Sequence, residues 1–211
     1  MTSMLEVRDL VVTFGKTFSV GPMNLVANRG VIHLKGPNGG GKTTLLRAMG
    51  GELLPSRGSV YANGQDVHSV IQARRHVALI TSAPELPAFL TVTEAYEFSA
   101  SLRGAPNWDG KPYCEALELD PALLLGYASA GQRSKAELIC GLAGDPAVLL
   151  LDETFAHLDE HSAVQLSQWI SDWSLSRVIV LAHHGSPPVT VDEVLDVPLN
   201  DGPLLDAVSV T

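Results

Sequence analysis

The chain has 211 residues, of which 45% are hydrophobic, a length that fits one domain with a buried core. Its 14 lysine and arginine residues face 23 aspartate and glutamate residues, and the formal charge of −9 argues against a nucleic-acid partner or an anionic membrane surface. The N-terminal segment lacks the pattern of a signal peptide, and no stretch approaches the roughly 18 apolar residues of a membrane span, so we expect a cytoplasmic protein whose membrane role comes through a partner.

Six segments have the alternating or continuous apolar pattern of β-strands. In chain order they are residues 5–14, 30–35, 58–64, 76–81, 147–153 and 177–184. The last three are almost entirely apolar, as expected for strands of a sheet that is covered on both faces. The chain is therefore predicted to have an α/β fold.

The most specific motif is GPNGGGKT, residues 36–43, which directly follows the apolar segment VIHL. It matches the phosphate-loop pattern G-x-x-x-x-G-K-S/T, in which glycines let backbone N–H groups approach phosphate oxygens. Lys42 supplies positive charge and Thr43 a hydroxyl for Mg²⁺, while the predicted helix over residues 42–49 directs its positive dipole end at the same phosphates. These residues predict a site for a nucleoside triphosphate.

The middle of the chain has helical patterns. Thr91 and Glu94 form a predicted capping box before a helix that reaches residue 102. A break rich in glycine and proline over residues 103–112 precedes a second helical stretch at residues 113–119. We expect residues 83–144 to form a helical insertion in a single domain, residues 1–211, whose core comprises residues 1–82 and 145–211. After Pro187 we expect only an edge strand or two.

A second motif, VLLLDE at residues 148–153, is an apolar strand that ends in two carboxylates. Burial of the strand places Asp152 and Glu153 at its C-terminal edge, beside the predicted phosphate loop. There Asp152 can hold Mg²⁺ through water, and Glu153 can orient or deprotonate an attacking water molecule. Upstream, ASAGQ at residues 128–132 opens a helix with Ser129 and Gly131, a start that suits a phosphate but that on its own is more typical of an ordinary N-cap.

In order and spacing, these motifs resemble those of the nucleotide-binding subunit of ATP-binding cassette (ABC) transporters, and the resemblance covers nearly the whole chain. GPNGGGKT resembles the Walker A motif of that family, ASAGQ its LSGGQ signature, LLLDE its Walker B motif, and TFAHLD, residues 154–159, its D-loop. The resemblance implies a P-loop NTPase core with an N-terminal antiparallel β subdomain and a helical insertion that carries the signature. It also implies ATP and Mg²⁺ as ligands and ATP hydrolysis as the activity.

The resemblance assigns roles to individual residues. It implies Glu153 as general base, His183 as the switch histidine against the γ-phosphate, and Lys42 as a catalytic as well as a phosphate-binding residue. ATP would lie in a head-to-tail dimer of like or unlike ATPase subunits, between the phosphate loop of one and the signature of the other. The implied nucleotide contacts are Phe14, Gly36, Asn38, Gly39, Gly40, Gly41, Lys42, Thr43, Thr44, Ser129, Gly131 and Gln132.

Four positions depart from the family pattern, and two of them, Ala128 and Ala130 of the signature, are minor changes because Ser129 and Gly131 are kept. Ser82, which with Thr43 and Asp152 makes up the implied metal contacts, stands where the family usually has a glutamine. A serine is too short to reach Mg²⁺ directly from the same backbone, which brings the hydrolysis rate and its coupling into question. Thr154 replaces the usual proline after the Walker B glutamate.

The family motifs leave two candidates for the aromatic residue that would stack on adenine. Phe14 is near the family position for this role, and Phe18 is an alternative. An aromatic residue near a turn is as often part of the core.

Other side chains fit structural roles better than functional ones. His184 is expected to be an exposed loop residue. His157 and His161 have the spacing of a helical zinc pair, but Asp159 and Glu160 between them are expected to cap a helix that begins there.

Two tryptophans and two cysteines are also expected to have structural roles. Trp169 and Trp173, four residues apart, are expected to form a packed stripe on a helix. Cys114 and Cys140 are far apart and lack metal-ligand spacing, so we expect reduced thiols.

The implied function is that of an ATP-hydrolysing subunit for a separate membrane-spanning transporter subunit at the inner face of the cell membrane. The short chain resembles the compact ATPases of export systems, including the haem-export subunit of cytochrome c maturation, which implies export. Two alternatives are a regulatory nucleotide-binding subunit with low turnover and a soluble ABC ATPase outside transport. Residues 82–92, with Leu86, Phe89 and Leu90, are expected either to dock the membrane subunit or to pack the insertion against the core.

Overall fold

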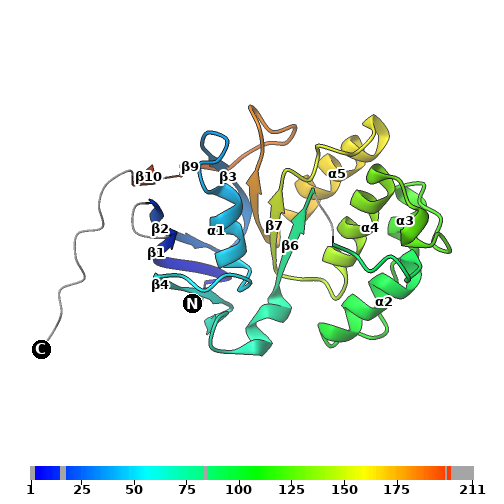
Figure 1. Cartoon of the computed structure of the whole chain (residues 1–211), viewed down its shortest axis with the longest axis horizontal. Helices are drawn as coiled ribbons and strands as arrows, with labels where there is room; N and C mark the ends of the chain where they lie inside the picture. The colour runs from blue at the N-terminus through cyan, green and yellow to red at the C-terminus, as the bar shows by residue number, and fades with distance from the viewer. Residues whose placement is uncertain (1–2, 15–17, 83–84, 198, 201–211) are drawn as a thin grey trace, which may run out of the picture.

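The computed structural model describes residues 3–14, 18–82, 85–197 and 199–200 (Figure 1). Its strands form two sheets, one antiparallel and one parallel. The antiparallel sheet has the order β10-β2-β1-β4-β5, with β1 (Leu5–Phe14), β2 (Phe18–Ala27), β4 (Arg57–Ala62), β5 (Gln65–Asp66) and β10 (Leu199–Asn200). The parallel sheet has the order β6-β7-β8-β3-β9, with β3 (Gly30–Lys35), β6 (Val77–Thr81), β7 (Val148–Asp152), β8 (Val178–Ala182) and β9 (Glu193–Asp196).

The described α-helices follow the strands in the order that the sequence patterns predict. They are α1 (Lys42–Met49), α2 (Val92–Leu102), α3 (Lys111–Ala116), α4 (Ala130–Leu142) and α5 (Glu160–Trp173), with short 3-10 helices at Ile71–His76 and Leu125–Tyr127. Among these described helices, none combines the length and apolarity that a membrane span requires. Figure 1 shows the parallel strands in the middle, with the antiparallel sheet on one side and α2 to α5 on the other.

Each central strand of the parallel sheet is apolar on both faces, because each face contributes to a different core. Successive side chains of a strand point to opposite faces, so Val178 and Val180 of β8 belong to the first core and Ile179 and Leu181 to the second. This arrangement confirms the prediction that the near-continuous apolar runs belong to a sheet covered on both sides.

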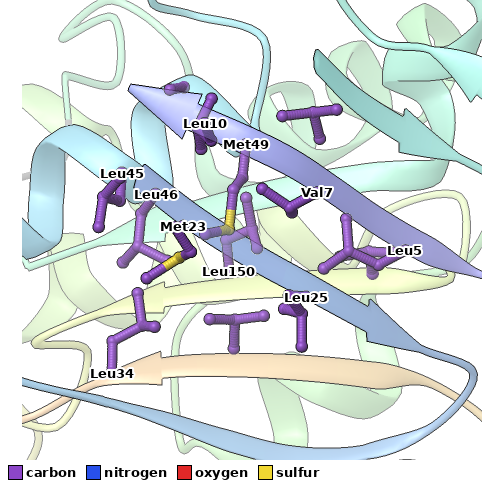
Figure 2. Close-up of a cluster of buried hydrophobic side chains, with 14 of the residues drawn as sticks. Leu5, Val7, Leu10, Met23, Leu25, Leu34, Leu45, Leu46, Met49 and Leu150 are labelled. Atoms are coloured by element: carbon purple, nitrogen blue, oxygen red, sulfur yellow. The ribbon is translucent and has the colours of Figure 1, made fainter. Parts of the chain in front are cut away.

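The first core joins the two sheets through α1. Figure 2 shows Leu45, Leu46 and Met49 of α1 between the antiparallel strands and the parallel strands, where Leu34 and Leu150 approach them. All five of these side chains are completely buried. Full burial of such a side chain contributes about 1.5–3 kcal/mol, so this cluster holds α1 firmly on the sheet.

The second core joins the other face of the parallel sheet to α2, α4 and α5. Gly141 of α4 lies against Ile80 of β6 so closely that a Cβ atom at this glycine would overlap the isoleucine side chain. The regular elements described between β6 and β7 are helices, as predicted for the insertion. Residues 83 and 84, where the insertion was expected to begin, lie outside the described residues.

The predicted helix caps are confirmed. Thr91 and Glu94 form a capping box at α2, in which the Glu94 carboxylate accepts from the Thr91 backbone N–H at 2.8 Å. Asp159 caps α5, where its carboxylate accepts from the Ser162 backbone N–H at 2.8 Å, and Glu160 stands in the first turn. The same carboxylate forms an ion pair with the buried Lys135 at 2.7 Å, which ties the start of α5 to α4.

The tryptophans pack against the second core, and the two cysteines are buried. Trp169 and Trp173 stack with their ring centroids 5.6 Å apart against the second core, which confirms the predicted stripe. Cys114 and Cys140 are free and buried, and burial raises the pKa of the Cys114 thiol to about 11. A thiol with such a pKa is protonated at neutral pH and unreactive.

Candidate functional site

A cavity of about 300 Å³ lies where the parallel strands end and α1 begins. This is the sheet edge at which α/β proteins bind ligands. The residues that line it are Phe18, Asn38, Gly39, Gly40, Gly41, Lys42, Thr43, Thr44, Asp152, Glu153 and His184. We call it the phosphate-loop cavity. It brings together the phosphate loop and the two carboxylates that the sequence places far apart.

The loop between β3 and α1 has a backbone that only glycine adopts easily. Gly39 and Gly41 have φ angles of 71° and 86°, in the left-handed region. A Cβ atom at Gly41 would also overlap the side chain of Val20. Gly41 is the N-cap of α1 and no side chain caps this helix, so its first backbone N–H groups are available to an anion.

Lys42 places its charge at the base of this loop. Its side chain is buried, and its Nζ donates hydrogen bonds to the carbonyl oxygens of Gly36 at 2.9 Å and Pro37 at 3.1 Å. An ammonium group has three donors, so one remains for a phosphate oxygen. The position and charge of Lys42 therefore suit the role predicted for it.

Asp152 and Thr43 form the candidate metal site. Asp152 is buried at the end of β7, where burial raises the pKa of its carboxyl and a hydrogen bond from the Thr43 side chain opposes that shift. Carboxylate and hydroxyl oxygens are ligands that Mg²⁺ prefers, and a cation here would offset the cost of burying the carboxylate. The two residues therefore fit Mg²⁺.

Ser82 lies beside this pair. It follows β6, whose last residue Thr81 pairs with Asp152, and its backbone N–H donates to the Asp152 carbonyl oxygen at 3.0 Å. The predicted metal position is thus next to the Walker B carboxylate in space. Ser82 itself is not among the described residues that line the phosphate-loop cavity.

Glu153 has a strained backbone next to the cavity. Its φ is 51°, a left-handed value that is rare outside glycine, asparagine and aspartate, and its backbone N–H donates to the Ala182 carbonyl oxygen at 3.0 Å. Its Oε2 accepts from the backbone N–H of His184 at 3.3 Å. Its Oε1 is buried and has no hydrogen-bond partner among the described residues, so it is available as an acceptor.

His183 lies behind Glu153. Its Nδ1 is 3.7 Å from the Glu153 Oε2 and, within the described part of the chain, has no hydrogen-bond partner. Burial lowers the pKa of its imidazole, and the charge of Glu153 opposes this shift. His183 lines a neighbouring cavity of about 750 Å³, which it shares with His33, Lys35 and other residues. The histidine is thus beside the predicted base, and the cavity that it lines also includes Gly36 and Pro37 of the phosphate loop.

The two phenylalanines occupy different places. Phe18 is among the described residues that line the phosphate-loop cavity, and Phe14 is not. Phe14 is exposed, and its ring centroid lies 6.1 Å from that of Phe18. The loop between them, residues 15–17, is outside the described residues. The alternative aromatic residue, Phe18, therefore lies closer to the phosphate loop than Phe14 does.

The signature residues are at the start of α4. Ser129 and Gln132 form a capping box, in which Gln132 N–H donates to the Ser129 hydroxyl at 3.2 Å and Ser129 N–H donates to the Gln132 side chain at 2.8 Å. Gly131 lies close to the His157 carbonyl oxygen. Among the described residues that line the phosphate-loop cavity, none comes from α4. The described signature residues therefore lie apart from the phosphate loop of their own chain.

The histidine pair at 157 and 161 does not gain a third ligand. His161 Nε2 lies 3.1 Å from the Ala116 carbonyl oxygen. Within the described ranges, no group of three or more His, Cys, Asp or Glu side chains has the arrangement of a metal site. His184, predicted to be an exposed loop residue, is exposed but lines the phosphate-loop cavity, a position that its sequence context did not reveal.

Comparison with known proteins agrees with this arrangement. Residues 21–156 match the family model described as ABC transporter. The chain is 33% identical over 177 residues to a sulfate/thiosulfate import ATP-binding protein of Bradyrhizobium diazoefficiens, covering 79% of this chain and 52% of that protein. It is 29% identical over 172 residues to a spermidine/putrescine import ATP-binding protein of Haemophilus influenzae, covering 78% and 46% of the two chains.

A solved structure of an ATP-binding subunit of an ABC transporter superposes with a TM-score of 0.79 at 25% identity, covering 86% of this chain and 79% of the other. The chain spans about half the length of the curated relatives it matches. Their names refer to import, so the expectation of export gains no support from them. The match of the family model over more than half of the chain shows that this protein belongs to the ABC transporter family, among its ATP-binding proteins.

Proposed function

We propose that this protein binds ATP with Mg²⁺ and hydrolyses it to drive a separate membrane-spanning transporter subunit. The observation that carries the proposal is the meeting of the phosphate loop with Asp152 and Glu153 in one cavity. A loop for phosphates, a carboxylate suited to a metal ion and a second carboxylate with a free oxygen are the groups that ATP hydrolysis requires.

The phosphates of ATP would lie on the phosphate loop. The backbone N–H groups at the start of α1 and the Nζ of Lys42 converge on the same cavity, and both favour negative charge. Toward the adenine, Phe18 lines the cavity and Phe14 is next to it, so this pair offers an aromatic surface on which a base stacks.

The metal ion would be held by Thr43 and Asp152. When bound, Mg²⁺ neutralises developing charge on the phosphate oxygens. Ser82 would act through a bridging water, and the hydrogen bond between its backbone N–H and the Asp152 carbonyl oxygen supports this assignment.

Glu153 is the proposed general base. Its free Oε1 would accept the proton of the attacking water, while Oε2 stays bonded to the His184 backbone. His183, 3.7 Å from that Oε2, would contact the γ-phosphate once nucleotide is bound. A base in this role contributes about 10²- to 10⁴-fold to the rate.

A second copy of the chain would complete the site. Ser129, Gly131 and Gln132 are at the N-terminus of α4, a helix start that suits the γ-phosphate of nucleotide on the partner. Phosphate release from ATP is the direct test, and its rate per molecule is expected to rise with protein concentration because two copies share each nucleotide. Absence of Mg²⁺-dependent phosphate release at every concentration would reject the proposal.

Substitution of Ser82 by glutamine, the residue that the family usually has at this position, gives one prediction. Ser82→Gln is expected to lower the Mg²⁺ concentration for half-maximal ATPase activity by about fivefold, because a direct contact replaces a water bridge at a gain on the order of 1 kcal/mol. A Mg²⁺ titration of phosphate release measures this, with Ser82→Ala as the variant that removes the hydroxyl. Identical titrations for Ser82→Gln and the wild type would show that this position does not reach the metal.

The proposed docking surface for the membrane subunit lies at the junction of core and insertion. Leu86 and Leu90 pack against the second core, which is the structural role considered for this segment, but Phe89 is 77% exposed. On α2, Phe98 and Leu102 are exposed one turn apart, so apolar side chains continue along the insertion. Through this subunit the protein would lie at the inner face of the membrane.

Phe89→Asp is therefore expected to reduce co-purification with an integral membrane protein at least about tenfold, because a charge is placed in an apolar contact. ATP binding by the isolated protein should not change. Leu175→Asp is the matched control, since Leu175 is an equally exposed apolar residue after α5. Equal capture of the membrane protein by wild type and Phe89→Asp would place the docking site elsewhere.

A further inference from the structure

His184 contacts both oxygens of the Glu153 carboxylate. Its backbone N–H donates to Oε2 at 3.3 Å, and its ring Nε2 lies 3.5 Å from Oε1. The same residue lines the phosphate-loop cavity and the neighbouring cavity behind it. His184 thus lines both cavities and lies beside Glu153, which lines the first of them together with Asp152.

The ring of His184 flanks Oε1 without using its hydrogen-bonding capacity. A separation of 3.5 Å is longer than the 2.7–2.9 Å of a strong charge-assisted hydrogen bond, and Oε1 makes no hydrogen bond to any described residue. Oε1 is buried and keeps free lone pairs with which to accept a proton. The His184 ring restricts the position of Oε1, and the hydrogen bond from the His184 backbone N–H fixes Oε2.

The segment that carries His184 is itself held from two sides. β8 pairs with β7 so that Ala182 is opposite Asp152, and the Ala182 carbonyl oxygen accepts from the Glu153 backbone N–H. On the other side, Nε2 of the buried His33 lies 3.3 Å from the His183 carbonyl oxygen. These contacts hold the two residues before His184, and the His184 backbone N–H itself donates to Glu153, so His184 is kept beside this carboxylate.

We propose that His184 is a positioning residue for Glu153, which fixes the orientation of the carboxylate at the phosphate-loop cavity, where this carboxylate deprotonates the attacking water. The inference rests on the proposed function, in which Glu153 is the base. It assigns to His184 a role separate from that of its neighbour His183, because His184 acts through the carboxylate and not on the phosphate.

The test is steady-state ATPase kinetics of His184→Ala, with His184→Gln as the conservative variant. Glutamine can place an amide N–H near the position of the histidine Nε2, so it should keep the carboxylate in place. We expect kcat of His184→Ala to fall about tenfold with KM for ATP within about twofold of wild type, because misplacing a reacting group slows chemistry and not binding. His184→Gln should recover most of kcat.

His161→Ala is the matched control, because His161 is an exposed histidine on α5 and should leave kcat unchanged. An unchanged kcat in His184→Ala would overturn the proposal, as would a rise in KM alone or a His184→Gln variant as slow as His184→Ala. If His184→Ala fails to fold, His184→Asp decides in its place. An added like charge beside Glu153 should stop turnover, whereas turnover equal to that of His184→Gln would contradict the positioning role.

The same assay separates this inference from the proposed function. An active wild type, an inactive Glu153→Gln and a fully active His184→Ala would reject only the positioning role of His184. A wild type without ATPase activity would reject the proposed function itself.

Discussion

Glu153→Gln is expected to stop ATP turnover and to leave ATP binding intact. The amide keeps the shape of the side chain but cannot take up the proton that Oε1 of the carboxylate would accept. Loss of a general base lowers the rate by about 10²- to 10⁴-fold. Single-turnover phosphate release measures the chemical step, and equilibrium titration with ATP measures binding.

Glu97→Gln is the control for this experiment, since Glu97 is an exposed glutamate on α2, outside the described lining of the phosphate-loop cavity. Its turnover should equal that of the wild type. If Glu153→Gln hydrolyses ATP at nearly the wild-type rate, the assignment of the general base is wrong, whatever its effect on binding.

Lys42→Ala should have its main effect on binding. The Lys42 Nζ is buried against the loop carbonyl oxygens of Gly36 and Pro37, so its charge is fixed where phosphates would lie. A hydrogen bond to a charged group contributes about 1.5–3 kcal/mol, which corresponds to a loss of about 10- to 150-fold in ATP affinity.

Titration with ATP measures this loss, and Lys111→Ala, which removes an exposed lysine at the start of α3, is the matched control. Unchanged affinity in Lys42→Ala would contradict the phosphate-loop assignment. A circular-dichroism melt of both variants shows whether removal of the buried side chain has also affected the fold.

Much of the fold could be predicted because its signals are local. The apolar runs of β7 and β8, and the capping boxes of α2 and α4, are each set by a few neighbouring residues. Two strands were missed, the two-residue β5 and the longer β2. Its centre contains Gly21 and Pro22, a pair that normally marks a turn, and the strand forms because it pairs with β1 and β10. Such pairing depends on distant residues and cannot be inferred from the segment itself.

In the candidate site, too, local motifs could be predicted, whereas contacts between distant segments could not. Gly41, Lys42 and Asp152 belong to continuous motifs, and the structure places all three in one cavity, as predicted. The approach of His184 to Glu153 was not predicted, because it depends on the register between β7 and β8. The presence of Phe18 in the cavity lining, and not Phe14, likewise depends on the antiparallel sheet, in which the two residues pair between β1 and β2.

The most direct test of the whole account is the mass of Glu153→Gln in solution, measured by analytical ultracentrifugation with ATP and, separately, with ADP. With ATP and Mg²⁺, the account predicts a species of twice the 22.4 kDa of the single chain, because the uncleaved nucleotide holds two subunits together. With ADP, it predicts a single chain. A protein that remains at the mass of one chain with ATP bound would contradict a site shared by two copies.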